Sequence, residues 1–503
     1  MRSSPHILAS TPRTIRFLLA LLLVMTGIRL LALGAYPLLD LTEARYAEIS
    51  RVMLATGNWI TPQLQPGVPF WGKPPLVFWC TAFSFKLFGI NEFAARLPSF
   101  LFSWFNLGLV FLLGRKIRGT HFGLLAAVVL GSTGFFFAVS ASVIIDTFLA
   151  ALTTLAMAAF VFTMEEKSDP QRLGWGYVFF ASLALGILAK GPIFCILTLT
   201  PIFVWIVIFR QGRAVRRNFP LVSGTVLLLV MAVPWFLIAE EKTPGFLNYF
   251  IIGEHFKRFL VSGWQGDLYG DAHRQPLGTI WGMAVPAMLP WLIILIAGLG
   301  RSWKAGHKIK EVLADRWLTL LVLWVLTPLV FFTLCRNILM TYLFPSLAAF
   351  ALITAWTLFS AHQREGEQGS RPWFLRNGVL VTFSLMVPLT LLLAGITVMP
   401  KVGDKKSQKN LVRAFLAADE TGNARLVYTR RLPYSASFYS RGRAQDIPDE
   451  SSGPIVASVR DEKLDFFAIR KDNLPQFPQE AVDRTREVGR FGNYFLRREK
   501  DAP

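Results

Sequence analysis

Long uninterrupted runs of apolar residues constrain this chain more than any other feature of its sequence. About eleven runs approach or reach the roughly 17–25 residues that a helix needs to cross a bilayer. They are Phe17–Gly34, Leu97–Leu113, Phe122–Val139, Thr147–Phe162, Trp175–Ala189, Ile193–Phe209, Leu221–Ala239, Gly278–Gly298, Trp317–Leu334, Thr341–Phe359 and Gly378–Val398. Charged residues make up 17% of the 503 residues, against about 25% in a soluble domain, and they cluster between the runs. The sequence therefore predicts a polytopic membrane protein.

Basic residues fall in every second connection between these runs. With the N-terminus in the cytoplasm, the inner loops hold Arg13 and Arg16, followed by basic clusters within residues 115–118, 167–172, 210–217, 301–316 and 364–376. Lys and Arg gather in this way on the cytoplasmic side of membrane proteins. An odd number of spans then places the C-terminal tail outside, together with two long outer loops at residues 35–96 and 240–277.

The first run has basic flanks and ends at Ala32-Leu33-Gly34, features that it shares with secretory signal peptides. Its apolar core is longer than the 7–15 residues that are usual in a signal peptide. We therefore interpret Phe17–Gly34 as an uncleaved first span.

The composition changes after Pro400 to a mixture of charged and apolar residues. The segments ARLVYTRRL, GPIVASVRD and FGNYFLRRE have the pattern of short strands, and KKSQKNLVRAFLAADE has that of a helix. About a hundred residues of this kind suit a small soluble α/β domain. We therefore expect a membrane domain at residues 1–399 and a soluble periplasmic domain at residues 400–503.

The formal net charge is +20, and there are three cysteines, Cys80, Cys195 and Cys335. The positive charge is spread over many loops with no nucleic-acid-binding motif. We therefore expect anionic membrane lipid or phosphate-bearing substrates as partners, and no nucleic acid. The cysteines lie far apart beside or inside apolar runs, without a CxxC motif. They predict buried thiols and neither a zinc site nor a disulfide framework.

A charged segment, YPLLDLTEARYAEIS at residues 36–50, follows the first run almost directly. Asp40 is a plausible N-cap for a helix that ends at Gly57, and Glu43 occupies the capping-box position. Glu48 can pair with a neighbouring arginine three residues away. An amphipathic helix on the outer leaflet would explain all these charges with no chemistry.

The rest of the same loop favours a functional interpretation. Lys73 lies in a Pro-rich turn, GKPPLVFW, with Trp59, Trp71 and Trp79 nearby. Aromatic residues at the interface are ordinary membrane anchors. A lysine fixed by two prolines among them suits the phosphate of a lipid headgroup.

Three segments of this loop together resemble a known family. TEARYAEISRVMLATGNWITPQL, GKPPLVFW and LFGINEFAARLPS are similar to the first periplasmic loop of bacterial polyprenyl-phosphate-dependent glycosyltransferases. The lipid A aminoarabinose transferases, which are related to protein O-mannosyltransferases, are the most similar group. The resemblance is dense over residues 40–99, thinner to about Tyr342 and absent from the C-terminal residues. It implies a mainly α, polytopic GT-C-type fold of about 11–13 transmembrane helices, with periplasmic amphipathic helices and a small C-terminal α/β domain.

Further positions match the family pattern. They lie in SASVIIDTFLA at the outer end of a span, in YFIIGEHFKRFL of the second outer loop, and in CRNILMTYLFPSLAAF, where an arginine replaces the usual lysine. The residues that these segments supply are Asp146, Glu254, His255, Arg258, Arg336 and Tyr342.

Two positions depart from the pattern. Many relatives have Asp-Glu before Arg-Tyr, whereas Thr42 precedes Glu43 here, so the choice of catalytic acid between Asp40 and Glu43 stays open. The aminoarabinose enzymes usually have an acid before the lysine of the KPP turn, and Gly72 stands there in this chain. That departure weakens any metal site that needs the acid.

The resemblance implies an inverting transfer of a sugar from a polyprenyl (undecaprenyl) phosphate carrier to a periplasmic acceptor at the bacterial inner membrane. Lipid A receiving 4-amino-4-deoxy-L-arabinose is the leading candidate. A base must take a proton from an acceptor hydroxyl, and cations must stabilise the departing phosphate. The candidate catalytic residues are Asp40, Glu43 and Asp146. The candidate substrate-binding residues are Lys73, Arg45, Tyr46, His255, Arg258, Arg336 and Tyr342.

Four of these residues have a structural alternative. Asp146 could cap the next span, His255 and Arg258 could contact interfacial lipid, and Tyr342 could be an interfacial anchor. An ionisable group at membrane depth favours function, which sets Asp146 apart. Lys190, in the segment AKGP, is expected to be structural or lipid-contacting and to lie outside the core site.

The acceptor stays open, because the loop resemblance reports the lipid-phosphate end of the reaction better than the sugar. A protein or another glycan is the alternative acceptor, and a lipid or sugar transporter is the alternative class of protein. Transporters typically show internal repeats, and we find none in the sequence. No cofactor and no metal ligand is assigned, and a divalent cation is left open.

The alternation of basic loops makes a prediction about topology. Reporter fusions after Arg118, Gly266 and Ala418 should read cytoplasmic, periplasmic and periplasmic, respectively, because basic connections stay inside. A cytoplasmic signal from the fusion after Ala418 would overturn the odd number of spans.

Overall fold

A computed structural model of the chain describes residues 7–8, 10–258, 261, 264–270, 274–304, 314–363, 372–420, 422–447, 455–456 and 464–500. The chain divides into two compact units. The first unit comprises Met1–Leu31, Phe70–Val77 and Leu97–Leu392, and the second comprises Ala32–Pro69, Phe78–Arg96 and Leu393–Pro503. The second unit thus contains most of the first outer loop as well as the C-terminal residues. The predicted division at residues 399 and 400 stays a prediction.

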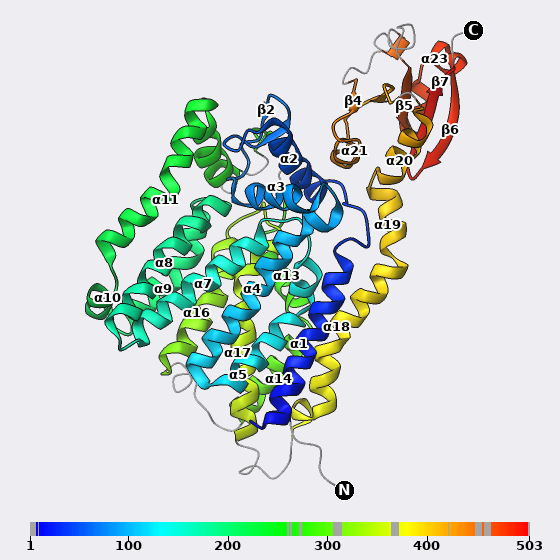
Figure 1. The fold of residues 1–503 in the computed structure, drawn as a ribbon. Helices are drawn as coiled ribbons and strands as arrows, with labels where there is room; N and C mark the ends of the chain where they lie inside the picture. The colour runs from blue at the N-terminus through cyan, green and yellow to red at the C-terminus, as the bar shows by residue number, and fades with distance from the viewer. Residues whose placement is uncertain are drawn as a thin grey trace. The chain divides into compact units, whose positions relative to one another are not determined.

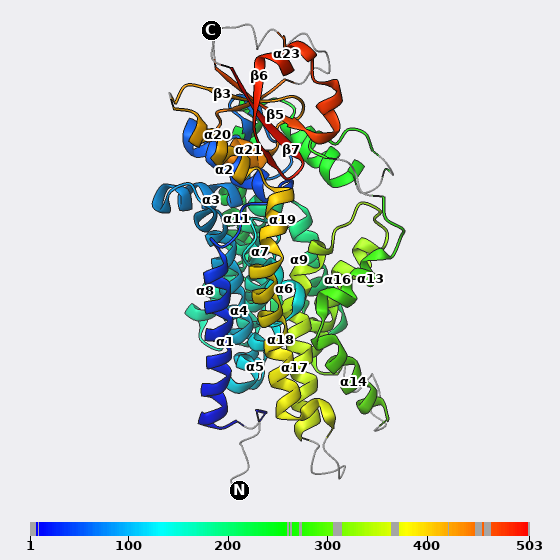
Figure 2. The same cartoon turned by 90° about the vertical axis from the view of Figure 1, so that its right-hand side faces the viewer.

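The first unit is a bundle whose long helices lie side by side (Figures 1 and 2). The ends of α1, α4 and α18 extend into the second unit. The helices are α1 Pro12–Ala32, α4 Glu92–Arg118, α5 Thr120–Gly131, α6 Gly134–Val139, α7 Asp146–Glu165, α8 Asp169–Lys190, α9 Ile193–Ile208, α10 Gly212–Asn218, α11 Leu221–Lys242, the π-helix η1 Asn248–Lys257, α13 Thr279–Met288, α14 Trp291–Lys304, α16 Arg316–Thr333, the 3-10 helix η2 Met340–Ser346, α17 Leu347–Gln363, the 3-10 helix η3 Trp373–Leu375 and α18 Asn377–Thr397.

All eleven predicted apolar runs fall on helices of this bundle. Within the described residues, eight helices are long and apolar enough to cross a membrane, or nine if α13 and α14, bent by 101° at their junction, form one broken span. The two remaining runs, Phe122–Val139 and Ile193–Phe209, coincide with shorter helices, namely α5 with α6, and α9. The predicted polytopic helical fold is confirmed.

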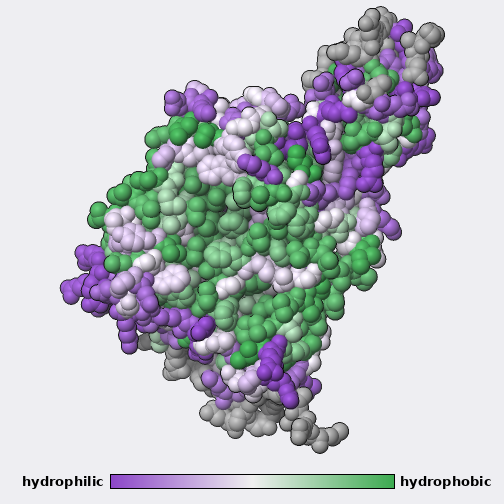
Figure 3. All heavy atoms as spheres, viewed as in Figure 1, coloured by the Kyte–Doolittle hydropathy of each residue, from purple (hydrophilic) through white to green (hydrophobic). Residues whose placement is uncertain are grey.

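Burial distinguishes the core of the bundle from its outer helices. The apolar window of α7 is 89% buried inside the protein, whereas those of α11 and α18 are only 17% buried. Helix α7 packs against α8, α9 and η2, and its many fully buried alanines allow the close helix contacts that are typical of membrane bundles. Hydrophobic side chains cover the visible face of the bundle (Figure 3). The exposed apolar surface of α11 and α18 suits contact with lipid.

The first outer loop forms α2 Thr42–Thr56, a small hairpin of β1 Gln63–Gln65 and β2 Val68–Pro69, and α3 Leu76–Phe88. Helix α2 ends at Gly57, which has a left-handed φ of 68°, as predicted. The predicted N-cap role of Asp40 is wrong. The helix begins one residue after Leu41, and no side chain of a described residue caps it. Asp40 is instead bound elsewhere in the second unit, as described below.

The C-terminal part of the second unit contains an α/β fold. Its sheet has five described strands in the order β4-β3-β5-β7-β6, in which β3 is parallel to both β4 and β5, and the remaining pairs are antiparallel. The elements are α19 Met399–Lys406, α20 Lys409–Ala418, β3 Arg425–Tyr428, α21 Tyr434–Tyr439, β4 Ala444–Asp446, β5 Asp465–Arg470, the 3-10 helix η4 Lys471–Gln476, α23 Gln479–Arg484, β6 Thr485–Phe491 and β7 Tyr494–Glu499.

Alternating residues of the central strands bury both faces of this sheet. On β5, Phe466 joins a cluster that includes α20 and α21, whereas Phe467 and Ile469 join a second cluster with Phe477 and Ala481. The alternation follows from the two-residue period of a strand. A sheet covered on both faces supports the predicted small C-terminal α/β domain.

The strand predictions in this region were right in part. ARLVYTRRL contains β3, FGNYFLRRE contains β7, and the predicted helix contains α20. In GPIVASVRD, the two described residues, Ile455 and Val456, are helical, and the rest of that segment lies outside the described residues. The central strand β5, with the sequence DFFAIR, was missed because it is buried on both faces and shows no alternation of apolar and polar residues.

Within the second unit, Arg96 ties the first outer loop to the start of α4. Its guanidinium is fully buried and donates two hydrogen bonds of 2.8 Å to the two carboxylate oxygens of Glu43. It also donates to the backbone carbonyls of Leu33, Tyr36 and Pro37 at 2.7–3.0 Å. A planar five-donor fork satisfies all these acceptors at once, and no other side chain can do so.

Replacing Arg96 by Met should therefore destabilise the protein by about 3–5 kcal/mol, because the largely buried Glu43 carboxylate would lose its guanidinium partner. Thermal unfolding in detergent measures the effect, with Lys86→Met on the exposed side of α3 as the control. An unfolding temperature equal to that of the control would show that this pair does not stabilise the loop.

Candidate active site

The turn that carries Lys73 is held by aromatic residues of the second outer loop. The backbone N–H of Trp71 donates to Tyr269 Oη at 2.8 Å, and its indole N–H donates to Thr243 Oγ1 at 3.2 Å. The ring of Phe70 packs on Tyr269 with a centroid distance of 4.5 Å. These contacts, together with the two prolines that follow Lys73, restrict the path of the turn.

The same packing accounts for the glycine before Lys73. A Cβ atom at Gly72 would lie 2.8 Å from Phe70 Cζ and 3.2 Å from Tyr269 Cδ2. There is no room at this position for the acid that the aminoarabinose enzymes usually carry. The carboxylate beside Lys73 comes from another segment.

That carboxylate is Glu254, in the π-helix η1. Lys73 Nζ lies 2.8 Å from Glu254 Oε2, and Arg258 Nη1 donates to both oxygens of Glu254 at 2.8 and 3.0 Å. Tyr249 Oη donates to Glu254 at 3.3 Å, and Arg258 also pairs with Asp267 at 3.3 Å. Two cations that are each about one-fifth exposed thus meet around a carboxylate that is 3% exposed.

The electrostatics of this cluster keep Glu254 ionised. Burial alone would raise its pKa, but the charges of Lys73 and Arg258 and their hydrogen bonds outweigh burial and lower the pKa to about 2. The pKa of Glu254 is lower in the folded than in the unfolded state. Its ionised form therefore stabilises the folded protein fully at pH values above 4.5, the ordinary pKa of a glutamate. That contribution is lost as the pH falls through about 2. The pKa of Arg258 is raised well above its usual value, because the neighbouring anions outweigh its burial.

His255 lies on the same π-helix, half-buried beside the cluster. Its Nδ1 lies 2.7 Å from the carbonyl oxygen of Phe250, and its Nε2 lies 3.3 Å from that of Lys190. Burial and the nearby positive charge of Lys73 lower its pKa. The imidazole is therefore neutral at pH 7, with Nδ1–H as a donor to Phe250.

Asp146 lies at the first turn of α7 and pairs with Lys190 at the end of α8. The helix N-cap is Ile145, and no described side chain caps α7, so the capping alternative for Asp146 is wrong. Lys190 Nζ also lies 4.9 Å from the centre of the Tyr342 ring. Lys190, which the sequence had placed outside the core site, is the direct partner of two candidate residues.

Further interactions join these groups within the first unit. Arg258 and Tyr342 are close enough to interact electrostatically, as are Lys73 and His255. Lys73, Asp146, His255, Arg258 and Tyr342 therefore belong to one network with Glu254 and Lys190. Arg336 is exposed, and its backbone carbonyl accepts a hydrogen bond of 2.9 Å from Gln275.

The other candidates belong to the second unit. Asp40 accepts a hydrogen bond of 2.8 Å from the Ser435 N–H and a second from the Ser435 hydroxyl. Arg45 lies over the rings of Tyr46 and Tyr434, at 5.5 and 5.9 Å, and Tyr46 is buried against Phe78. Burial raises the pKa of Asp40, although the hydrogen bonds from Ser435 and the charge of Arg431 oppose the rise.

The structure adds four residues that the sequence-based site omitted. Glu254 was visible beside His255 in the matched segment, and Lys190 was visible as a charge at the outer end of a span. Arg96 and Asp267 gave no local signal, because their partners are far away in the sequence. Among the described residues, no group of three or more His, Cys, Asp or Glu side chains is placed to hold a metal ion.

Comparison with known proteins shows which proteins this chain is similar to. Residues 14–250 match the family model described as dolichyl-phosphate-mannose-protein mannosyltransferase. The chain is 30% identical over 365 residues to the undecaprenyl phosphate-alpha-4-amino-4-deoxy-L-arabinose arabinosyl transferase 1 of Sodalis glossinidius, covering 71% of this chain and 61% of the relative. The family resemblance predicted from the loop motifs is confirmed.

Other family members extend the comparison. The corresponding transferase 1 of Pseudomonas fluorescens is 30% identical over 380 residues, which cover 74% of this chain and 62% of the relative. The chain spans about three fifths of the length of these curated relatives. The crystal structure of ArnT from Cupriavidus metallidurans bound to undecaprenyl phosphate has the same fold, with a TM-score of 0.77 at 19% identity, over 97% of this chain and 98% of that one. The chain is thus a multi-pass membrane protein with the fold of that structure.

Lys73→Ala should reduce sugar transfer by about 10²-fold or more, because the carrier phosphate would lose a positioned cation. Lys73→Arg should restore only part of the rate, since a planar fork differs from a compact ammonium. Transfer from a polyprenyl-phosphate sugar is measured with purified protein, and Lys257→Ala, an exposed neighbour on η1, is the matched control. A normal rate in Lys73→Ala would remove Lys73 from the site.

Measuring sugar transfer and thermal unfolding on the same variants should distinguish the roles of the three candidate carboxylates. Asp146→Asn should cut turnover by about 10²–10⁴, the usual contribution of a general base. Glu43→Gln should mainly lower the unfolding temperature, because Arg96 loses its partner, and Asp40→Asn should keep most of the activity. Full activity in Asp146→Asn would exclude Asp146 as the base.

Proposed function

We propose that the chain transfers a sugar from a polyprenyl-phosphate carrier to a periplasmic acceptor with inversion at the anomeric carbon. Relatives at 30% identity are named for arabinosyl transfer from undecaprenyl phosphate-4-amino-4-deoxy-L-arabinose. We therefore propose undecaprenyl phosphate as the carrier and 4-amino-4-deoxy-L-arabinose as the sugar. Lipid A is the proposed acceptor.

The observation that carries this proposal is the network of Lys73, Glu254 and Arg258. Glu254 holds two cations together at a position where neither is fully exposed. A lipid phosphate can form charge-assisted hydrogen bonds to both cations. Asp267 supplies a second carboxylate to Arg258, but Lys73 and Arg258 each stay about one-fifth exposed, so a further anion can still reach both cations.

The chemistry follows from this arrangement. The acceptor oxygen forms a bond to the anomeric carbon while the bond from that carbon to the carrier phosphate breaks, and the electron pair leaves with the phosphate. Lys73 and Arg258 stabilise the charge that develops on this leaving group. Asp146, in the same network, is the proposed base for an acceptor hydroxyl. For a phosphate acceptor, which is already ionised, Asp146 would help to orient and desolvate the nucleophile.

We place this reaction at the periplasmic face of the bacterial inner membrane. The alternation of basic loops supports that orientation, because Lys73, Glu254 and Arg258 lie in connections that follow an odd number of spans. The soluble domain at residues 400–503 would then also be periplasmic.

Mass spectrometry of lipid A and membrane glycolipids tests this proposal most simply. Cells that express the chain should contain lipid A heavier by one aminopentose, and cells without it, or with Lys73→Ala, should not. If lipid A is unchanged and cells without the chain instead lack a sugar on a protein or another glycan, that molecule is the acceptor in place of lipid A. No sugar change in any fraction would contradict transfer itself.

A further inference from the structure

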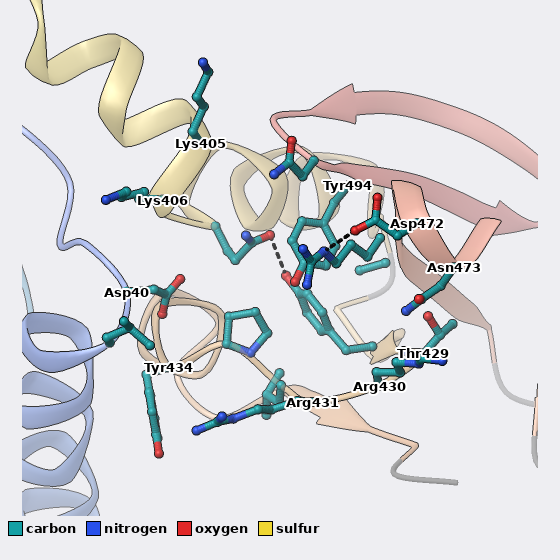
Figure 4. A pocket seen from close by; sticks show the side chains of 18 residues that line it. Asp40, Lys405, Lys406, Thr429, Arg430, Arg431, Tyr434, Asp472, Asn473 and Tyr494 are labelled. Atoms are coloured by element: carbon teal, nitrogen blue, oxygen red, sulfur yellow. Dashed lines mark hydrogen bonds and ion pairs between the residues drawn. The ribbon is translucent and has the colours of Figure 1, made fainter. Parts of the chain in front are cut away.

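A cavity of about 500 Å³ lies within the second unit. Its walls come from the end of α19, the segments after β3 and β5, the residues just before β7, and the stretch before α2 (Figure 4). Polar and charged side chains contribute much of its lining, namely Asp40, Lys405, Lys406, Thr429, Arg430, Arg431, Tyr434, Arg470, Asp472, Asn473, Asn493 and Tyr494.

The topology of the sheet makes this a natural binding position. Strands β3 and β5 are parallel neighbours, and the cavity is at their carboxyl ends. The chain leaves β3 toward β4 on one side and leaves β5 toward β6 and β7 on the other. Adjacent parallel strands whose connections diverge open a crevice, and in α/β sheets ligands bind at such a switch point.

The charge of the lining favours an anion. Five basic side chains and two carboxylates line the cavity. Asp40 is bound by Ser435, and Asp472 pairs with Arg470 at 3.1 Å. Among the described residues, neither Lys405 nor Lys406 forms an ion pair.

The uncharged side chains of the lining indicate a ligand larger than a lone phosphate. Tyr434 and Tyr494 offer rings and hydroxyls, whereas Thr429 and Asn473 offer hydrogen-bond donors and acceptors. A cavity of about 500 Å³ has the size of a small-molecule site. Hydroxyls and amides of this kind match the hydroxyls of a saccharide.

We propose that this cavity binds a phosphorylated saccharide, with the phosphate held by the basic residues and the sugar by the tyrosines and amides. The site shares no residue with the Lys73–Glu254–Arg258 network. Two sources supply this chemistry, a soluble sugar phosphate and the phosphorylated headgroup of a glycolipid. Only the glycolipid source rests on the proposed function, in which lipid A is the acceptor.

Binding to the purified full-length chain tests the proposal. The soluble probe is glucosamine 6-phosphate, compared with glucosamine, and the lipid probe is lipid A in phosphatidylcholine nanodiscs, compared with dephosphorylated lipid A. The test variant is Lys406→Gln/Arg431→Gln. The control, Lys401→Gln/Arg486→Gln, removes one lysine of α19 and one arginine of the sheet, both exposed and outside the cavity.

A phosphate-dependent affinity that falls about tenfold or more, which corresponds to about 1.4 kcal/mol, in the test variant and not in the control supports the site. Binding of the soluble probe identifies a sugar phosphate, and binding of the lipid probe alone identifies a headgroup. Equal affinity in the two double variants, or no preference for the phosphorylated probes, would overturn the proposal. Sugar transfer is assayed separately, so failure of the proposed enzyme would leave this result standing.

Discussion

The pairing of buried charges is the constraint on which the candidate site depends. A carboxylate removed from water costs several kcal/mol unless a cation and hydrogen bonds replace the lost hydration. Glu254 meets this requirement with Lys73, and Glu43 meets it with Arg96. Each pair joins segments that are distant in the sequence. The loops that carry the candidate residues are therefore fixed by the same charges that the chemistry would use.

These pairs differ in whether their cations can still bind a further anion. Both oxygens of Glu43 are taken by one fully buried arginine, which marks this pair as a structural anchor. Lys73 and Arg258 share Glu254, Arg258 also pairs with Asp267, and both cations remain partly exposed. An anion that enters beside them gains two cations without first breaking a satisfied pair. Electrostatic preorganisation of this kind is a large part of catalysis on charged groups.

The sequence predicted the bundle well and the pairs poorly. Apolar length alone located every run that became a helix, because a segment in lipid must satisfy its own backbone hydrogen bonds. The family motifs located Lys73 and the segment around His255. Arg96, Asp267 and the partnership of Asp146 with Lys190 could not be predicted, since they depend on how distant segments pack. Local rules likewise favoured Asp40 as a helix cap, whereas the fold binds it to Ser435.

The central claim is that Lys73 and Arg258 receive the phosphate of the carrier lipid. An experimental structure of the purified chain with undecaprenyl phosphate tests it most directly. We expect a phosphate oxygen about 2.7–2.9 Å from Lys73 Nζ, the distance of a charge-assisted hydrogen bond, and a second contact to Arg258. A phosphate bound elsewhere, with Lys73 and Arg258 still paired only with Glu254 and Asp267, would contradict it.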